Sequence, residues 1–168
     1  MLYFTADEHY NHNNIIEYQN RPFTSVEDMN NQLILNHNNI VDVNDMVYHI
    51  GDFAVKGLPF SHERILSLLN GRHFLIRGNH DRSGKKTYLN AGFIGITKQT
   101  YVAGFRLQHK PDYMSNDWHL SGHGHNTYTI RNHAINVGVD VNDFKPLSLT
   151  QIKEIVNIME EKTNYENA

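Results

Sequence analysis

The chain has 168 residues, a formal net charge of -3 with its histidines neutral, 39% hydrophobic residues and no cysteine. This length suits one domain with one sizeable core, and the lack of cysteine excludes a disulfide framework and a thiolate metal site. No apolar run is long enough to span a bilayer, and no basic stretch indicates an extended nucleic-acid surface. Twelve histidines are a high number for this length, and histidine is the commonest metal ligand.

The first predicted strand covers residues 2–6 and ends in Asp7, Glu8 and His9. Residues i and i+2 of an extended segment face the same side, so Asp7 and His9 form half of a metal site while Glu8 points away. Residues 10–13 are expected to form a polar loop beside them. The acidic pair comes too early for a signal peptide, and we expect a cytoplasmic protein.

Helices and strands then alternate along the first half of the chain. The capping-box spacing of Thr24 to Glu27 predicts a helix to about residue 38. The further elements expected are a strand at 46–50 ending in Gly51-Asp52, a helix from Phe60-Ser61 to Asn70-Gly71, a strand at 74–77 running into Gly78-Asn79-His80-Asp81, and a short helix at 83–91. This order predicts an α/β fold with right-handed crossovers. Two further histidines, His37 and His49, are interpreted as structural.

The second half consists of short β-favouring segments at about 94–103, 105–109, 117–121, 127–131 and 134–139, separated by turn signals. This series of short segments separated by turns predicts an antiparallel or mixed sheet. Ser148 and Gln151 have the spacing of another capping box, which predicts a last helix. Because we find no linker or repeat, we expect a single domain over residues 1–160 and a polar C-terminal tail over 161–168.

Histidines at the ends of the later segments complete a candidate ligand set. His109 closes one segment, and Gly122-His123-Gly124-His125 places two imidazoles on one side of the chain. With the earlier loops, the chain offers seven oxygen and nitrogen donors: Asp7, His9, Asp52, Asn79, His109, His123 and His125. Such donors suit Mn, Fe or Zn. Seven are too many for one ion but suit two ions that share a carboxylate, and such a pair can clamp a phosphoryl group.

These motifs, in this order, resemble the calcineurin-like metallophosphoesterases from about residue 3 to residue 147. The segment 136–140, with 146–148, resembles a small bacterial and phage branch of that family. The resemblance implies two mixed β-sheets flanked by helices, a four-layer sandwich with its site at loop ends. Gly124 is a departure, since the family more often has threonine between the two histidines.

The resemblance also implies a role for each motif residue. One metal is held by Asp7, His9, Asp52 and His125, and the other by Asp52, Asn79, His109 and His123. Asp52 bridges them, and a metal-bridging hydroxide attacks phosphorus. His80 is then no ligand but protonates the leaving oxygen or steadies the transition state, and Asp81 orients His80.

The substrate is the least determined part of this interpretation. His12, Asn11 and Arg82 are the candidates for substrate binding. The small size leaves no room for a capping domain, so we expect an open site that suits phosphodiesters or nucleotides, with Mn²⁺ as the first ion to test. A phosphomonoesterase, a dinucleotide pyrophosphatase and a nuclease remain alternatives on the same site. A non-enzymatic scaffold and a histidine-rich metal buffer are the remaining readings.

Overall fold

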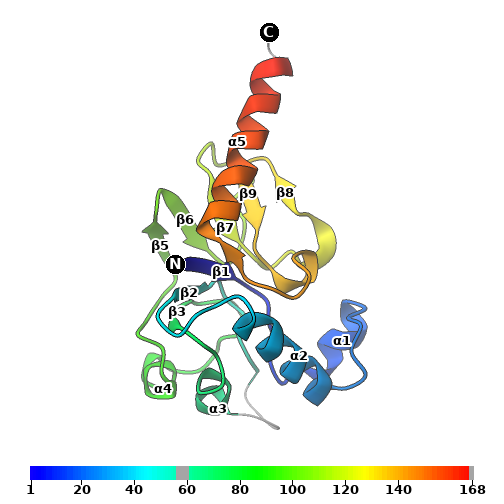
Figure 1. Cartoon of the computed structure of the whole chain (residues 1–168), viewed down its shortest axis with the longest axis vertical. Coiled ribbons are helices and arrows are strands. Elements are labelled where there is room, and N and C mark those ends of the chain that lie inside the picture. Colours follow the sequence, from blue (N-terminus) through cyan, green and yellow to red (C-terminus); the bar gives the residue numbers. More distant parts are fainter. Residues whose placement is uncertain (56–60, 167–168) are drawn as a thin grey trace.

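The computed structural model describes residues 1–55 and 61–166 and contains two mixed five-stranded sheets (Figure 1). The first sheet has the order β10-β1-β2-β3-β4, and its strands are β1 (Leu2–Thr5), β2 (Met46–His49), β3 (Arg72–Ile76), β4 (Gly95–Thr97) and β10 (Leu147–Ser148). The second has the order β5-β6-β7-β9-β8, and its strands are β5 (Gln99–Val102), β6 (Phe105–Gln108), β7 (His119–Ser121), β8 (Ile130–Arg131) and β9 (Ala134–Asn136). The predicted fold class is confirmed.

Helices flank the sheets on two sides (Figure 1). Helices α1 (Asn13–Tyr18), α2 (Val26–Asn38), α3 (His62–Leu66) and α4 (Lys85–Ala91) pack on the outer face of the first sheet, and α5 (Leu149–Glu166) packs against β10 and β1. Two 3-10 turns, η1 (His125–Thr127) and η2 (Val139–Val141), follow β7 and β9. Within the described ranges, no helix has the length and apolar character needed to cross a membrane.

Two hydrophobic clusters follow from the alternation of side chains along the strands. Leu75 faces the helices and packs with Met29 and Leu33, whereas the next residue, Ile76, faces the second sheet and packs with Leu107. Each such buried side chain contributes about 1.5–3 kcal/mol relative to exposure. The two sheets are therefore held face to face by an apolar layer, and their loops meet at its edge.

The segment 94–103 was expected to be one strand, but it forms two. Its first part, β4, runs parallel to β3 in the first sheet, and its second part, β5, runs antiparallel to β6 in the second sheet. The chain thus crosses between the sheets at Lys98. In the second sheet the inner strands β6, β7 and β9 are parallel, and the edge strands β5 and β8 are antiparallel to them.

Helix boundaries also differ from the prediction at several points. The polar loop after residue 10 continues into α1, whose Ile15 is buried. The N-cap of α2 is Ser25, whose side chain accepts from the backbone N–H of Asp28, so the capping pair lies one residue later than predicted. Ser61 caps α3, while Phe60 lies outside the described residues. The Ser148–Gln151 capping box is confirmed, and α5 continues to Glu166 within the segment predicted as a tail.

Candidate metal centre

The carboxyl ends of the parallel strands meet at one edge of the two sheets. Asp7 follows β1, Asp52 follows β2, Asn79 follows β3, His109 follows β6 and His123 follows β7. Loops at such strand ends are where open α/β sheets bind ligands. Contacts across the edge join the sheets here, since the backbone N–H of His123 donates to Asp7 Oδ2 at 2.7 Å.

The predicted ligands fall into two groups. In the first ligand group, Asp7, His9 and His125 each offer a donor atom, and these atoms lie within 4.8 Å of one another. The second ligand group, Asp52, His109 and His123, meets the same criterion. Asn79 joins the second group, because its Oδ1 lies 3.1 Å from His109 Nε2. All seven predicted ligands are thus brought together.

Asp52 lies between the two groups. Its Oδ2 is 3.2 Å from His109 Nε2 in the second group and 3.6 Å from His9 Nε2 in the first. Its Oδ1 accepts from the backbone N–H of His80 at 2.8 Å. One carboxylate oxygen therefore faces both groups while the other fixes the loop that carries His80.

Hydrogen bonds behind the imidazoles determine which ring nitrogen faces the centre. His109 Nδ1 donates to the carbonyl of Ile50 at 2.9 Å, which leaves Nε2 as the nitrogen with a free electron pair. His125 Nδ1 bonds Asp140 Oδ2 at 2.8 Å, with the same result. Such partners orient a ligating histidine and fix its tautomer.

The backbone at the ligands is mostly left-handed. Asp7, His9, Asp52, His123 and His125 have φ values of 57, 51, 58, 65 and 46°. Non-glycine residues pay about 1–2 kcal/mol for this conformation, and it persists only where the surroundings hold it. The concentration of such residues in one place indicates a site built at a cost in stability.

Buried polar atoms without a partner provide a test of whether cations fit. Asp7 is 0% exposed and His9 1% exposed, yet Asp7 Oδ1 and both ring nitrogens of His9 have no hydrogen-bond partner. Leaving such atoms unpaired in the interior is costly. Because the donors are oxygen and nitrogen and converge, a divalent cation such as Mn²⁺, Fe²⁺ or Zn²⁺ fits them.

The electrostatics of these groups differ: burial keeps His9 neutral, whereas neighbouring carboxylates outweigh burial and raise the pKa of His109 and His125, so a cation there would compete with protons. Burial raises the pKa of Asp7 to about 7 and lowers the pKa of His9 to about 2, so the imidazole is neutral, as a metal ligand must be. Burial also opposes ionisation of Asp52, but the nearby His109 imidazole and the backbone N–H of His80 outweigh it and lower the pKa to about 2. A cation placed between these carboxylates offsets the penalty for burying them.

His80 and Asp81 lie beside the ligand groups but do different things. The half-buried ring of His80 has its centroid 5.2 Å from that of His9. Asp81 accepts from the backbone N–H groups of Asp52, Gly78 and Phe53 at 2.8, 2.8 and 3.1 Å. We expected Asp81 to orient the His80 ring. Its carboxylate ties the loop after β2 to the loop after β3, because three backbone donors point at it, and its action on the His80 ring stays a prediction.

The three residues predicted to bind substrate are placed differently. His12 has its ring centroid 5.5 Å from His9 and 6.2 Å from His80, at the centre. Arg82 is exposed, and its Nε donates to the carbonyl of Asn79. Asn11 is only 8% exposed, and its Oδ1 accepts from Asn30 of α2. Asn11 therefore supports the packing of α2, and the substrate contact predicted for it stays a prediction.

Sequence reasoning missed Arg21 and Asp140. Arg21 is buried and paired with Asp140, which also bonds His125. Asp140 stands in the closing segment 136–140 that carried part of the resemblance, and this was its only signal. Arg21 lies in a polar stretch after α1 and had none.

The side chain of Glu8 belongs to a second polar cluster, which lies beneath α2 and apart from the ligand groups. Glu8 Oε1 bonds His49 Nδ1, and His49 Nε2 lies 3.0 Å from His73 Nδ1. His37 of α2 packs against His73 and bonds the carbonyl of Asn70 at 2.8 Å. Burial raises the pKa of Glu8 to about 8 and lowers that of His49 to about 3, so the pair is neutral overall. His37 and His49 are structural, as predicted.

Two glycines allow the close approach of the ligand loops. A Cβ at Gly78 would run into the carboxylate and backbone of Asp52, so a larger residue there would displace the shared ligand. A Cβ at Gly124 would run into the ring of Tyr128. The ring of Tyr128 therefore accounts for glycine at the position where the family more often has threonine.

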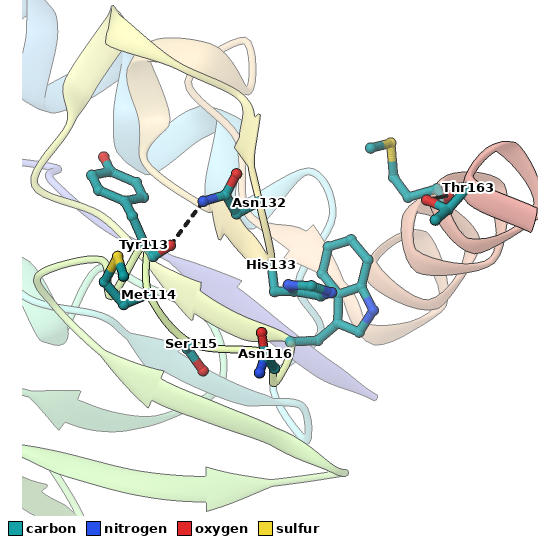
Figure 2. A pocket seen from close by; sticks show the side chains of 9 residues that line it. Tyr113, Met114, Ser115, Asn116, Asn132, His133 and Thr163 are labelled. Atoms are coloured by element: carbon teal, nitrogen blue, oxygen red, sulfur yellow. Dashed lines mark hydrogen bonds between the residues drawn. The ribbon is translucent and has the colours of Figure 1, made fainter. Parts of the chain in front are cut away.

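A cavity of about 550 Å³ lies away from these residues (Figure 2). It is lined by the segment 113–118, the turn between β8 and β9, and α5, with Trp118 and His133 in edge-to-face contact. None of the predicted ligands lines it.

A fold of two mixed sheets with candidate metal ligands at the strand ends is that of a metal-dependent phosphoesterase. The chain belongs to the calcineurin-like phosphoesterase family, whose sequence model matches residues 2–164. It is 40% identical over 167 residues to the uncharacterized protein MJ1445 of Methanocaldococcus jannaschii, covering 92% of this chain and 90% of that protein. It is also similar to the crystal structure of AQ665, a protein of unknown function from Aquifex aeolicus. That match has a TM-score of 0.72 and 28% identity, and it covers 92% of this chain and 98% of the other.

Proposed function

We propose that this chain is a dinuclear metal-dependent phosphodiesterase that hydrolyses a phosphodiester or nucleotide substrate. The observation that carries the proposal is the position of Asp52 Oδ2, within 3.2 Å of His109 Nε2 and 3.6 Å of His9 Nε2. A carboxylate placed between two convergent ligand groups is suited to bridge two cations. Family membership and the unpartnered donor atoms of Asp7 and His9 support the same reading.

The proposed ligand sets follow the two groups. Asp7, His9 and His125 hold one ion, His109, His123 and Asn79 hold the other, and Asp52 is shared. When bound, two divalent ions supply a polarised water and positive charge at the phosphoryl group. Two such ions carry four positive charges against the two negative charges of Asp7 and Asp52, so the site attracts a phosphate anion.

His80 is the proposed proton donor to the leaving oxygen. Its ring lies 5.2 Å from the ring of His9, centroid to centroid, and its backbone is held by Asp52. Its side chain is half-buried, so one face of the imidazole remains open to a substrate. Asp81 keeps this loop in register with the loop that carries Asp52.

The exposure of the ligands favours a substrate that is not enclosed. His123 and Asn79 are exposed on the second group, and His12 is half-buried beside His80. A diester has two substituents on phosphorus and needs room on both sides, which an open edge provides. Mn²⁺ is the ion we propose, because carboxylate, amide and imidazole donors accommodate it.

Hydrolysis of bis-p-nitrophenyl phosphate and p-nitrophenyl phosphate tests the proposal. Both are assayed after chelation and after adding back Mn²⁺, Zn²⁺ or Fe²⁺, with bound ions counted per chain. We expect metal-dependent turnover, faster on the diester. A preference for the monoester would redirect the search to phosphorylated metabolites, and two bound ions with no turnover would support the scaffold alternative.

His12 is the proposed contact to the substrate phosphate. Replacing His12 by alanine is expected to raise KM about tenfold, which is about 1.4 kcal/mol of binding, while both ions stay bound. Steady-state kinetics on the preferred substrate measure this. Arg82→Ala is the companion variant, because Arg82 is exposed next to Asn79. Unchanged kinetics of His12→Ala on every substrate would end this assignment.

A further inference from the structure

Arg21 is a buried guanidinium with every N–H group engaged. Its side chain is 0% exposed. Nε donates to Asp140 Oδ1 at 2.8 Å, and Nη2 donates to Asp140 Oδ2 at 3.0 Å and to the carbonyl of Asp7 at 2.7 Å. Nη1 donates to the carbonyl of Glu8 at 2.9 Å and contacts Met29 Sδ at 3.4 Å. These contacts use all the donors that a guanidinium has.

The partners of Arg21 are the supports of the first ligand group. Its two carbonyl partners belong to the peptide groups between Asp7 and His9. Its carboxylate partner, Asp140, accepts from His125 Nδ1 at 2.8 Å. A single side chain therefore joins the loop after β1 to the turn that carries His125, although the two are far apart in the sequence.

The same loop needs such support because its backbone is strained. Asp7 and His9 have φ values of 57 and 51°, and His125 has 46°. Left-handed residues of this kind keep their conformation only where surrounding contacts over-determine it. The planar, forked donors of arginine can hold two carbonyls and a carboxylate at once, which the single ammonium group of lysine cannot.

The second ligand group has different supports. His109 is held by the carbonyl of Ile50, and the shared Asp52 is held by the backbone N–H of His80. Neither contact involves Arg21 or Asp140. The groups meet where the backbone N–H of His123 donates to Asp7 Oδ2, but the partners behind their ring nitrogens differ. We therefore expect substitution of those partners to act on one group at a time.

We propose that Arg21, acting with Asp140, is a positioning residue that sets the metal affinity of the first ligand group and leaves the second group unchanged. The proposal rests on the dinuclear centre of the proposed function. It predicts that metal affinity falls at one of the two metal positions. A general destabilisation of the fold would instead lower the affinity at both positions. Loss of a partner behind a metal ligand typically lowers metal affinity about 10- to 100-fold.

The test is equilibrium dialysis of the whole chain against Mn²⁺ after chelation, with bound ions counted per chain. Wild type is expected to bind two ions. Arg21→Lys is expected to keep one site at wild-type affinity and to weaken the other about 10- to 100-fold. His123→Ala is the reference variant for the other site, because it is expected to lower the metal affinity of the second group. The double variant with Arg21→Lys is expected to have lower metal affinity at both sites.

Arg106→Lys is the matched control. Arg106 Nη2 pairs with Asp112 Oδ2 at 3.0 Å, another arginine–aspartate pair, with no contact to either ligand group. It is expected to leave both sites intact. Asp140→Asn tests the same link from Asp140 and is the variant to use if Arg21→Lys does not fold. Asparagine keeps the shape of the side chain but has one acceptor oxygen, so at least one of the three N–H groups that donate to Asp140 loses its partner.

The outcomes separate the two proposals. If wild type binds two ions and both Arg21→Lys and Asp140→Asn bind them as wild type does, the role of Arg21 is refuted and the proposed function stands. Equal weakening of both sites also refutes it, because the effect is then not confined to one group. If wild type binds no Mn²⁺ and no other divalent ion, the proposed dinuclear function itself fails.

Discussion

Asp7 and Glu8 are neighbours in the chain, but their side chains enter two polar clusters of opposite design. Around Asp7, carboxylates and imidazoles converge until their donor atoms lie within 4.8 Å of one another, and several have no hydrogen-bond partner. Around Glu8, the same residue types form a line through His49 to His73, in which each bonds the next, although Glu8 Oε2 and His73 Nε2 also have no hydrogen-bond partner. Convergence suits cation binding, whereas a line of mutually bonded groups suits the cohesion of a core. The comparison shows that the arrangement, and not the abundance of histidine, indicates a metal centre.

The largest expected loss of turnover follows substitution of Asp52, the residue that both ligand groups of the convergent cluster share. Asp52→Asn is expected to abolish measurable turnover, because the amide brings no charge and turns its NH₂ group either toward both ligand groups or toward the backbone N–H of His80. Turnover on the preferred substrate and the number of bound ions measure this. Asp117→Asn, at an exposed surface position, is the control and is expected to retain both. Full activity of Asp52→Asn would contradict the bridging role.

The next largest expected effect is on kcat, and it tests whether His80 is a catalytic group or a metal ligand. His80→Ala is expected to lower kcat about 10²–10⁴-fold, the usual contribution of a general acid, while both ions remain bound. His133→Ala, in the cavity beside Trp118, is the histidine control and is expected to keep wild-type kcat. If His80→Ala loses an ion, His80 is a ligand and the assignment is wrong.

In the cluster of Glu8, His49 and His73, a substitution is expected to lower the free energy of unfolding and to leave metal binding unchanged. His49→Ala removes the partner of the buried Glu8 and leaves a cavity, and we expect the free energy of unfolding to fall by about 3 kcal/mol. Urea unfolding with chelator present measures it. Both ions are expected to bind as in wild type. Loss of metal at unchanged stability would mean that the two clusters act as one.

The last expected effect concerns the dependence of stability on pH. Burial lowers the pKa of His37 to about 4 and that of His73 to about 2, whereas both are near 6.5 in the unfolded chain. Below pH 6.5 the unfolded state therefore takes up protons at these two imidazoles that the folded state does not, so their contribution to stability falls as the pH drops, whereas the raised pKa of Glu8 acts in the opposite direction. At pH 5 each imidazole accounts for about 2 kcal/mol.

Urea unfolding between pH 7 and pH 5 measures this loss. His37→Gln is the matched variant, because an amide can still donate to the carbonyl of Asn70 but does not titrate. Its stability is expected to depend less steeply on pH than that of wild type. An identical slope would show that His37 does not contribute.

The sequence predicted the candidate ligands because several stand within three residues of a strand end, and strand ends are determined by local pattern. Asp7, Asp52 and His109 are cases of this kind. Arg21 could not be found in this way, because its partner Asp140 lies in a distant segment and the pair forms only when the fold closes. The bond of Asn11 to Asn30 was missed for the same reason, since only the packing of α2 reveals it.

For the fold, too, the elements with a clear local pattern were predicted, and features that depend on distant contacts were missed. The alternation of strands and helices in the first half predicted the α/β class, and the Ser148–Gln151 box predicted the start of α5. The break between β4 and β5 was missed, because a continuous β-favouring segment gives no sign that its two ends pair in different sheets. The short α1 was missed as well, since six residues carry too little periodicity to be distinguished from a loop.

The contact between Gly124 and Tyr128 has a consequence for how this chain and its relatives can diverge. Because the ring of Tyr128 occupies the space of a side chain at position 124, the two positions cannot change independently. A threonine at 124 requires a smaller residue at 128, and that residue would give up the hydroxyl contact to Ser121. Relatives are therefore expected to carry one of two residue pairs, so that a single substitution between the histidines marks a different packing of the whole loop.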